Sequence, residues 1–458
     1  LKVQYFGAGG LLLPVVGLTL LVGLAGGAYP AFQLSSYQPA AILKANKSST
    51  DAQGSGRLRN ILVVAQFAVS IALMVCTAVV YNQTMFARSA DPGYQREGLL
   101  TVAGLRNPEV RKLRETLTRE IARIPGVTNV AATLIVPAEG PTFFTTAQIP
   151  GRTAGVTIGS YSVEPAFFDT MKLDVVAGRK LSRSFANDSI YVDPDATEEA
   201  ADAAARTIAA RGFNMMVNES GAKLLGFSDP ASAVGKQIGI PAFGEEIGNV
   251  PATIVGIAKD TRFRSVRDPI QPIIYYDDGL YRYLAVRFEG ADPVAVQSGI
   301  ERIWQRLLPE VPFTASLTDD KLAKLYGAEE ARGRTFGSFA LLAIVIACLG
   351  LFGLAAFTAE RRTKEIGIRK VFGATVRDIV QLLVWQFSRP VVIANLVAWP
   401  VAWWLMRDWL NGFDARIPLG PGPFLLAGLI AFAIAVATIA GHAIKVARTN
   451  PIHALRYE

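Results

Sequence analysis

The stretch Thr335–Ala359 reads TFGSFALLAIVIACLGLFGLAAFTA, which is 25 residues without one charged side chain. A helix needs about 20 apolar residues to cross about 30 Å of hydrocarbon, and it satisfies its own backbone hydrogen bonds there. A buried helix of a soluble protein usually keeps a polar face, and this stretch has none. The stretch therefore predicts a membrane-spanning helix.

Comparable apolar runs recur along the 458-residue chain, in which 51% of residues are hydrophobic and 18% are charged. The shortest run has 17 residues, and the apolar face of the preceding Ile379–Phe387 lengthens it. A cleaved signal peptide is a poor interpretation of the first run, because only one basic residue precedes it. We therefore expect five spanning helices. The runs lie between Arg59 and Arg88, Arg389 and Arg407, Arg416 and Lys445, and, around the block Leu11–Phe32, Lys2 and Lys44.

Lys and Arg gather in some of the segments between these runs and not in others. They are frequent in 34–59, 360–388 and the tail after Lys445, whereas the short loop 408–423 balances Arg416 with acidic residues. Because cytoplasmic loops carry the excess of Lys and Arg, this pattern predicts a cytoplasmic C-terminus and an extracytoplasmic segment 88–334. The formal charge of +8 is then a topology signal, and no basic face for nucleic acid is indicated.

These boundaries divide the chain into alternating membrane and water-exposed segments. We expect the last span of a first half (1–33), a linker (34–59), a span (60–87), an extracytoplasmic domain (88–334), a span (335–359), a cytoplasmic segment (360–388), a span (389–407), an outer loop (408–423), a span (424–445) and a cytoplasmic tail (446–458).

The extracytoplasmic segment shows two similar orders of strand, helix and strand. Leu99–Ala103 and Val130–Val136 read as strands around one amphipathic helix, and Tyr283–Phe288 and Phe313–Leu317 read as strands around another. Two such units predict an α/β domain of the split βαβ, ferredoxin-like type. The segment 137–282 between the two units is then expected to form an inserted mixed β lobe.

Residue types argue against catalysis in this chain. Both cysteines, Cys76 and Cys348, lie in apolar runs, and both histidines, His442 and His453, lie at or after the end of the last run. A Ser–His–Asp triad in the domain, a disulfide there and a zinc site are therefore not expected. A phosphate-binding G-x-x-x-x-G-K-[ST] motif is absent from the sequence. We expect no catalytic residue, no metal and no cofactor in this chain.

An internal repeat relates the two ends of the chain. Ala28–Lys44 matches Ala440–Arg456 at a constant offset of 412 residues, and each copy ends in Pro-x-x-x-Leu followed by a basic residue. The repeat indicates two homologous halves. Because the chain opens at Leu1, a few residues before an apolar run, we expect that the first half is truncated.

Several motifs resemble those of MacB/FtsX-type ABC transporter permeases, in the form with two permease halves and a MacB-like periplasmic core domain. In the extracytoplasmic segment the resemblance rests on Tyr161–Arg179, which includes FFDTM and AGR, and on Val217–Glu219. Nearer the C-terminus it rests on Leu308–Phe313 (LPEVPF), Lys324–Glu329 (KLYGAE), Ala347–Leu354 (ACLGLFGL) and Glu360–Ala374 (ERRTKEIGIRKVFGA).

The resemblance implies that Glu360–Ala374 is the coupling element that contacts an ATPase subunit. Its interleaved charged and apolar residues suit a protein-docking face, although a solvated loop against lipid headgroups is the alternative. ATP would be hydrolysed on a separate nucleotide-binding subunit or a missing segment. The residues expected to couple are Glu360, Arg361, Lys364, Glu365, Ile366, Gly367, Arg369, Lys370 and Gly373.

Glycines also mark faces on which the spanning helices are expected to pack closely. Gly23 with Gly27, and Gly350 with Gly353, place small residues about one turn apart. Charged residues are absent from the deep parts of the runs, which argues against an ion relay.

The resemblance implies a permease of the inner membrane, working as a homodimer or pseudo-dimer with an ABC ATPase. It would export or extract a lipid, lipoprotein, peptide or toxic compound, with help from a possible periplasmic partner. The alternative is a membrane receptor or scaffold that transports nothing and regulates a periplasmic or cell-wall partner.

Overall fold

The computed structural model describes residues 12–35 and 52–447, except for residues 141, 245 and 362. The chain divides into two compact units, Leu1–Val64 and Ala65–Glu458, and each is described by itself. In the first unit, α1 (Leu12–Ser35) precedes the beginning of α3 (Ala52–Ser89). Within α1 the apolar part found among the described residues is Leu12–Leu24, which is shorter than a full span. A fifth span therefore stays a prediction.

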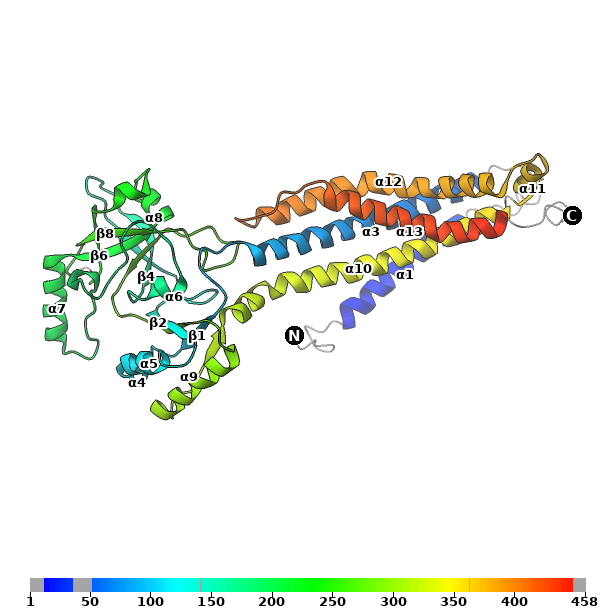
Figure 1. Cartoon of the computed structure of the whole chain (residues 1–458). Coiled ribbons are helices and arrows are strands. Elements are labelled where there is room, and N and C mark those ends of the chain that lie inside the picture. The colour runs from blue at the N-terminus through cyan, green and yellow to red at the C-terminus, as the bar shows by residue number, and fades with distance from the viewer. Residues whose placement is uncertain (1–11, 36–51, 141, 245, 362, 448–458) are drawn as a thin grey trace. The chain divides into compact units, whose positions relative to one another are not determined.

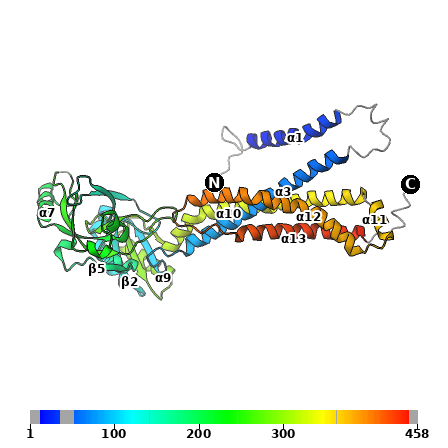
Figure 2. The same ribbon diagram turned by 90° about the horizontal axis from the view of Figure 1, so that it is seen from above.

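Four helical segments among the described residues are long and apolar enough to cross a membrane. The protein is therefore a multi-pass membrane protein, and α10 runs from the α/β domain along α13 to α11 (Thr363–Val371) in Figures 1 and 2. The segments are Asn60–Ser89 in α3, Thr318–Thr358 in α10 (Thr318–Arg361), Val376–Asn411 in α12 (the same bounds) and Gly422–Lys445 in α13 (Gly422–Ala447).

Two of these helices are longer than the apolar runs that predict them. α10 begins at Thr318, well before the expected span 335–359, and α12 begins at Val376, before the expected span 389–407. A helix satisfies its backbone hydrogen bonds whatever its side chains are, so it continues through charged residues into water. The charged residues therefore indicate where a helix leaves the apolar part of the membrane, and they do not indicate where the helix ends.

Small residues are buried at regular spacing on α12 and on α13, which pack against each other. On α13, Ala427, Ala431 and Ala435 are buried four residues apart, and on α12, Ala398 and Ala402 are buried at the same spacing. Such stripes let helix backbones approach closely in a membrane. A Cβ added to Gly428 of α13 would lie 2.3 Å from Asn395 Oδ1 of α12, so a larger residue here would have to displace the Asn395 side chain.

The water-exposed part of the second unit is an α/β domain, and its first lobe is a four-stranded sheet. The strand order is β11-β1-β10-β2, with antiparallel neighbours throughout. Two helices connect β1 to β2, and one connects β10 to β11. The bounds are β1 Leu99–Ala103, α4 Pro108–Lys112, α5 Arg114–Ile121, β2 Val127–Thr133, β10 Tyr283–Phe288, α9 Pro293–Leu307 and β11 Ala315–Leu317.

The second lobe, inserted between β2 and β10, is a mixed sheet. Its strand order is β3-β4-β9-β6-β8-β5, with β7 on β8; the pairs β4–β9 and β6–β8 are parallel and the others antiparallel. The bounds are β3 Phe143–Ala147, β4 Val156–Ser162, α6 Phe167–Met171, β5 Val175–Gly178, η1 Ala186–Asp188, α7 Glu198–Arg211, β6 Phe213–Asn218, α8 Glu219–Leu224, η2 Pro230–Ala233, β7 Gln237–Ile240, β8 Val250–Ala258 and β9 Ile273–Tyr276.

Each lobe has its own apolar core, and a third core joins the two lobes. Helices α5 and α9 cover the first sheet with Leu117, Ile300 and Trp304, all buried. The joining core contains the two phenylalanines of α6, which packs on β2 and β10. Arg287 of β10 is fully buried and donates from Nε to the carbonyl of Thr170 and from Nη2 to the carbonyl of Gln95, at 2.8 Å each. The lobes are therefore one packed domain.

Candidate functional site

The first candidate site, which we call the elbow, comprises α11, residues 372–375 and the first turn of α12. The helix α11 ends at Gly373, whose φ of +94° lies in the region that favours glycine. The Gly373 N–H donates to the carbonyl of Lys370, and the Ala374 N–H donates to the carbonyl of Arg369, each at 3.0 Å. This pair of bonds is a Schellman cap, which ends the helix sharply.

The next helix begins immediately, at a capping box. The Thr375 hydroxyl oxygen accepts from the Asp378 N–H at 3.3 Å, and the Asp378 carboxylate accepts from the Thr375 N–H at 2.9 Å. The reciprocal bonds satisfy two donors that a helix start leaves unpaired. Two consecutive caps therefore define the bend between α11 and α12 from local residues alone.

The elbow carries apolar side chains that the described part of the chain does not cover. Phe372 is 86% exposed and Val371 is 66% exposed, and Ile368 is also exposed. Beside them, Arg369 Nη2 lies 2.9 Å from Glu365 Oε1, and both side chains are about half exposed. Exposed apolar groups of this kind mark a site of contact with another protein or with lipid.

The structure places the expected coupling residues on two faces. Glu365, Arg369, Lys370 and Gly373 lie on the outer side of the elbow, whereas Ile366 and Gly367 are buried. The side chains of Glu360, Arg361 and Lys364 lie outside the described residues. Phe372, the most exposed of the elbow's large apolar side chains, lies within the expected coupling stretch Glu360–Ala374 but was not among the residues named for coupling.

The expected glycine faces differ in their surroundings. A Cβ on Gly350 would lie 3.0 Å from Gln66 Oε1 of α3, whereas Gly353 has no heavy atom within 4 Å of such a Cβ. Gly23 likewise has none, and the surroundings of Gly27 lie outside the described residues. Two glycines that the sequence analysis missed also face α3, with Gly333 at 3.4 Å from Val80 and Gly337 at 3.5 Å from Thr77.

The second candidate site lies at the other end of the helices, where they meet the α/β domain. We call it the domain junction. It consists of the domain loop 262–268, the turn 413–417 between α12 and α13, Gln83 of α3, and Tyr326 and Glu329 of α10. Within it, Val266, Tyr326 and Phe413 form a small buried apolar cluster.

Two arginines of the domain loop hold the turn between α12 and α13. The Arg267 guanidinium lies 4.0 Å from the centre of the Phe413 ring and 3.1 Å from Glu329, whose side chain is 12% exposed. Arg262, 14% exposed, lies 2.8 Å from Asp414. Arg267 and Asp414 are themselves 33% and 42% exposed, so each ion pair joins a covered group to a partly exposed one.

Backbone groups add to the junction. The Ala415 N–H donates to the carbonyl of Val266 at 3.1 Å, and the buried Gln83 side chain donates to the Ala415 carbonyl at 3.0 Å. The same Gln83 amide accepts from the Ile417 N–H at 2.9 Å. The turn is therefore fixed both to the domain and to α3.

Sequence reasoning did not predict the junction, although one motif contained part of it. Lys324–Glu329 was one of the motifs that carry the resemblance, and no role was predicted for it. This motif supplies Glu329 and Tyr326, and the Tyr326 hydroxyl accepts from the Val266 N–H at 3.3 Å. Arg267, by contrast, stands in an arginine-rich loop, and nothing local distinguishes it.

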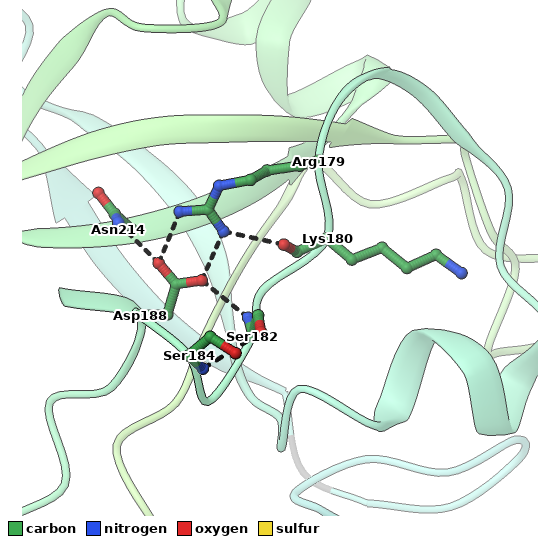
Figure 3. A network of polar contacts seen from close by, with 6 residues as sticks. All are labelled: Arg179, Lys180, Ser182, Ser184, Asp188 and Asn214. Atoms are coloured by element: carbon green, nitrogen blue, oxygen red, sulfur yellow. Dashed lines mark hydrogen bonds and ion pairs between the residues drawn. The ribbon is translucent and has the colours of Figure 1, made fainter. Parts of the chain in front are cut away.

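The motifs singled out in the α/β domain have structural roles. Figure 3 shows Arg179, of the AGR motif, forming two hydrogen bonds of 2.6 and 2.9 Å with Asp188. Asn214 and the Ser182 N–H also donate to this carboxylate, at 2.6 and 2.7 Å. Gly178 precedes the arginine with φ +75°, and a Cβ there would lie 2.3 Å from the Val255 carbonyl oxygen.

The charges of this network stabilise one another. Burial by itself raises the pKa of Asp188, which is 1% exposed, but the hydrogen bonds from Arg179, Asn214 and Ser182 outweigh it and lower the pKa. The same hydrogen bonding raises the pKa of Arg179. The network thus keeps an ion pair inside the second lobe, which is a structural function and not a catalytic one.

Comparison with known proteins agrees with these features. Residues 337–451, which include the elbow, match the family model described as FtsX-like permease C-terminal. The chain is 27% identical over 186 residues to the macrolide export ATP-binding/permease protein MacB of Escherichia coli, and the alignment covers 36% of this chain and 27% of that protein. The match therefore spans little more than a quarter of that relative's length.

A second relative covers more of the chain. The identity is 24% over 330 residues with the uncharacterized ABC transporter permease YvrN of Bacillus subtilis, covering 65% of this chain and 70% of that protein. The solved periplasmic region of MacB from Actinobacillus actinomycetemcomitans aligns with 51% of this chain and 94% of that one, at 11% identity and a TM-score of 0.32. The matched permease domain and these sequence relatives support a permease of the MacB/FtsX type.

Proposed function

We propose that this chain is the permease subunit of an ABC transporter that carries ATP-driven motion across the inner membrane to its α/β domain. The motion would serve the export or extraction of a lipid, lipoprotein, peptide or toxic compound. The single observation that carries the proposal is the elbow, which combines a rigid, doubly capped bend with the exposed side chains of Val371 and Phe372.

The excess of Lys and Arg supports placing the elbow in the cytoplasm and the α/β domain in the periplasm. In this orientation an ATPase subunit would reach the elbow, and the C-terminus would lie on the same side. ATP would be bound and hydrolysed by that partner, because the sequence contains no phosphate-binding loop of its own. A homodimer or pseudo-dimer would bring two elbows to two ATPase subunits.

The helices provide a path between the two ends. α10 continues from Thr318, directly after β11, to Arg361 at the elbow end. Its 44 residues span about 66 Å at about 1.5 Å per residue. α10 is one continuous helix between the two ends, and the domain junction ties the turn between α12 and α13 to the same domain. We also infer that the first lobe is of the ferredoxin-like type, which the strand order β11-β1-β10-β2 supports.

The test uses the full-length protein purified in nanodiscs with its candidate ATPase. We expect the double variant Glu365→Lys, Arg369→Glu to lose ATPase association and stimulated ATP turnover. It keeps an opposite-charge pair four residues apart on the helix, so α11 loses only a few tenths of a kcal/mol while the sign of each surface charge is reversed.

A matched control is available in the α/β domain. Asp202 and Arg206 of α7 form a comparable exposed pair four residues apart, at 2.8 Å, and their charges can be reversed in the same way. The control should keep wild-type association and turnover. If the elbow variant behaves like wild type and no ATPase associates, the coupling proposal fails and the receptor or scaffold function takes its place.

A further inference from the structure

The α/β domain contains a cavity of about 550 Å³ that none of the roles above uses. It lies where β3, β4 and the loop after β9 face the segment that follows β1. Its volume is within the range of about 300–1,000 Å³ that is typical of sites for small organic molecules. Because residues of both lobes line it, the cavity belongs to the assembled domain.

The floor of the cavity is polar and well ordered. Ser160 Oγ and Tyr276 Oη share a hydrogen bond of 2.8 Å, and both side chains are buried. Next to them, Ser162 donates to Asp278, which also accepts from the Leu280 N–H at 2.9 Å. Burial raises the pKa of Asp278.

The rim is apolar and exposed. Phe143, Phe144 and Leu280 are 46%, 61% and 66% exposed, and all three line the cavity. Large apolar side chains gathered at one opening of a water-exposed domain indicate a surface that an apolar group covers. The geometry thus offers an apolar contact surface above a floor of hydroxyl groups.

Arginines give the opening a positive charge. Arg106, Arg111 and Arg282 line the cavity, whereas Asp278 is the acidic residue that lines it among the described residues. Arg111 also lies 2.8 Å from Asp195, which neutralises part of this charge. The Arg282 guanidinium lies 5.9 Å from the centre of the Phe143 ring, so a positive charge sits directly beside the apolar rim.

We propose that this cavity binds an amphipathic organic anion, a small molecule with an aromatic or aliphatic body and a carboxylate or sulfonate group. The body would lie against Phe144 and Leu280, and the anionic group would accept hydrogen bonds from Arg106 and Arg282. A hydroxyl or carbonyl of the ligand would bind the Ser160–Tyr276 pair. Binding requires no ATP and no ATPase, so the inference stands apart from the transport proposal.

The experiment measures binding of naphthalene-1-sulfonate to the full chain in nanodiscs by isothermal titration calorimetry, without ATP. Empty nanodiscs of the same lipid give the background from partition into lipid. We expect saturable binding above that background, and weaker binding of 1-naphthylmethylammonium, which has the same ring system and a positive charge. Equal binding of the two probes would overturn the inference.

Two variants locate the binding site. Arg106→Gln combined with Arg282→Gln should weaken binding of naphthalene-1-sulfonate about tenfold or more, because two charge-assisted hydrogen bonds are lost. Phe144→Ser should weaken it about threefold to tenfold by removing apolar contact. These side chains lie at the surface or at the rim, so the fold does not depend on them.

The matched controls are Arg206→Gln on α7 and the exposed Val176→Ser on β5, both in the same domain and away from the cavity. Both controls should bind like wild type. Binding that is unchanged in the cavity variants, or that falls equally in the controls, would show that the cavity is not the site.

Discussion

The two ends of the membrane helices are built in opposite ways. At the domain junction, Gln83, Arg267 and Glu329 are covered, and their partners lie 60 to more than 300 residues away in the sequence. At the elbow, the bonds that define the bend join residues no more than five positions apart, and Phe372 is 86% exposed. One end is completed by the chain itself, whereas the other presents a surface that a second protein can complete.

This difference separates stability from function. Covered polar groups cost free energy when a partner is removed, because they stay buried without a hydrogen bond. Exposed apolar groups cost the isolated chain almost nothing when they are removed. Substitutions at the junction should therefore change folding, and substitutions at the elbow should change partner binding.

The largest loss of stability is expected in the second lobe of the α/β domain, away from both the domain junction and the elbow. The effects predicted at those two sites are smaller. Asp188→Asn removes the buried carboxylate that accepts hydrogen bonds from Arg179, Asn214 and the Ser182 N–H, and should destabilise the α/β domain by about 3 kcal/mol. Urea unfolding of the full chain in detergent, followed by hydrogen exchange of β5 and β6, measures this. Asp202→Asn, in the exposed pair of α7, is the control and should cost less than about 0.5 kcal/mol.

The same substitution has a pH dependence of defined sign. The pKa of Asp188 is lowered in the fold, so its contribution is complete above the unfolded-state pKa of about 3.9 and is lost as the pH falls through the folded-state value. The difference in free energy of unfolding between wild type and Asp188→Asn should therefore shrink below about pH 3.9. If the difference in free energy of unfolding stayed constant with pH, the destabilisation would come from altered packing and not from the lost charge.

At the domain junction, Arg267→Ala removes the ion pair with Glu329 and the contact with Phe413. We expect a local loss of about 2 kcal/mol, because the Glu329 carboxylate is left mostly covered. Amide exchange in the turn 413–417 should accelerate about 30-fold. The control is Arg416→Ala, which replaces an exposed arginine of the same turn. Equal acceleration of amide exchange in both variants would show that Arg267 does not hold the turn.

At the elbow, Gly373→Ala tests the cap by itself. Nothing lies within 4 Å of a Cβ at Gly373, so the expected cost of about 1 kcal/mol comes only from the positive φ. Gly353→Ala is the matched control, since its Cβ also meets nothing within 4 Å and the residue is helical. Hydrogen exchange at 371–376 should rise in Gly373→Ala, and no change in either variant would show that the bend is held by other contacts.

The smallest effect on stability is expected for Phe372→Ser. The side chain is 86% exposed, so the free energy of unfolding should change by less than about 0.5 kcal/mol. ATPase association should nevertheless be lost if Phe372 forms the docking surface, and co-purification in nanodiscs measures that. Val294→Ser, a change of an exposed apolar side chain (69%) in the α/β domain, should keep the ATPase bound. Association that survives Phe372→Ser would mean that the exposed apolar residues contact lipid instead.

Sequence reasoning succeeded where the determining residues are neighbours. Strands Leu99–Ala103 and Tyr283–Phe288 have the expected bounds, whereas α12 begins at Val376, before the expected span 389–407. The glycine faces were harder to predict, since spacing alone does not say which side of α10 meets α3. Gly350 faces that helix while Gly353 does not, and Gly333 and Gly337 were missed.

The sequence by itself determined the membrane helices, the α/β character of the domain and the position of the elbow, because each depends on apolar runs, periodicity or caps within a few turns of chain. Only the tertiary structure brought Gln83, Arg267 and Phe413 together, and only it placed Phe144 and Arg282 around one cavity. Such sites depend on contacts between distant residues. The chain has several similar arginines and aromatic residues. The packing of both lobes and four helices decides which of them come into contact.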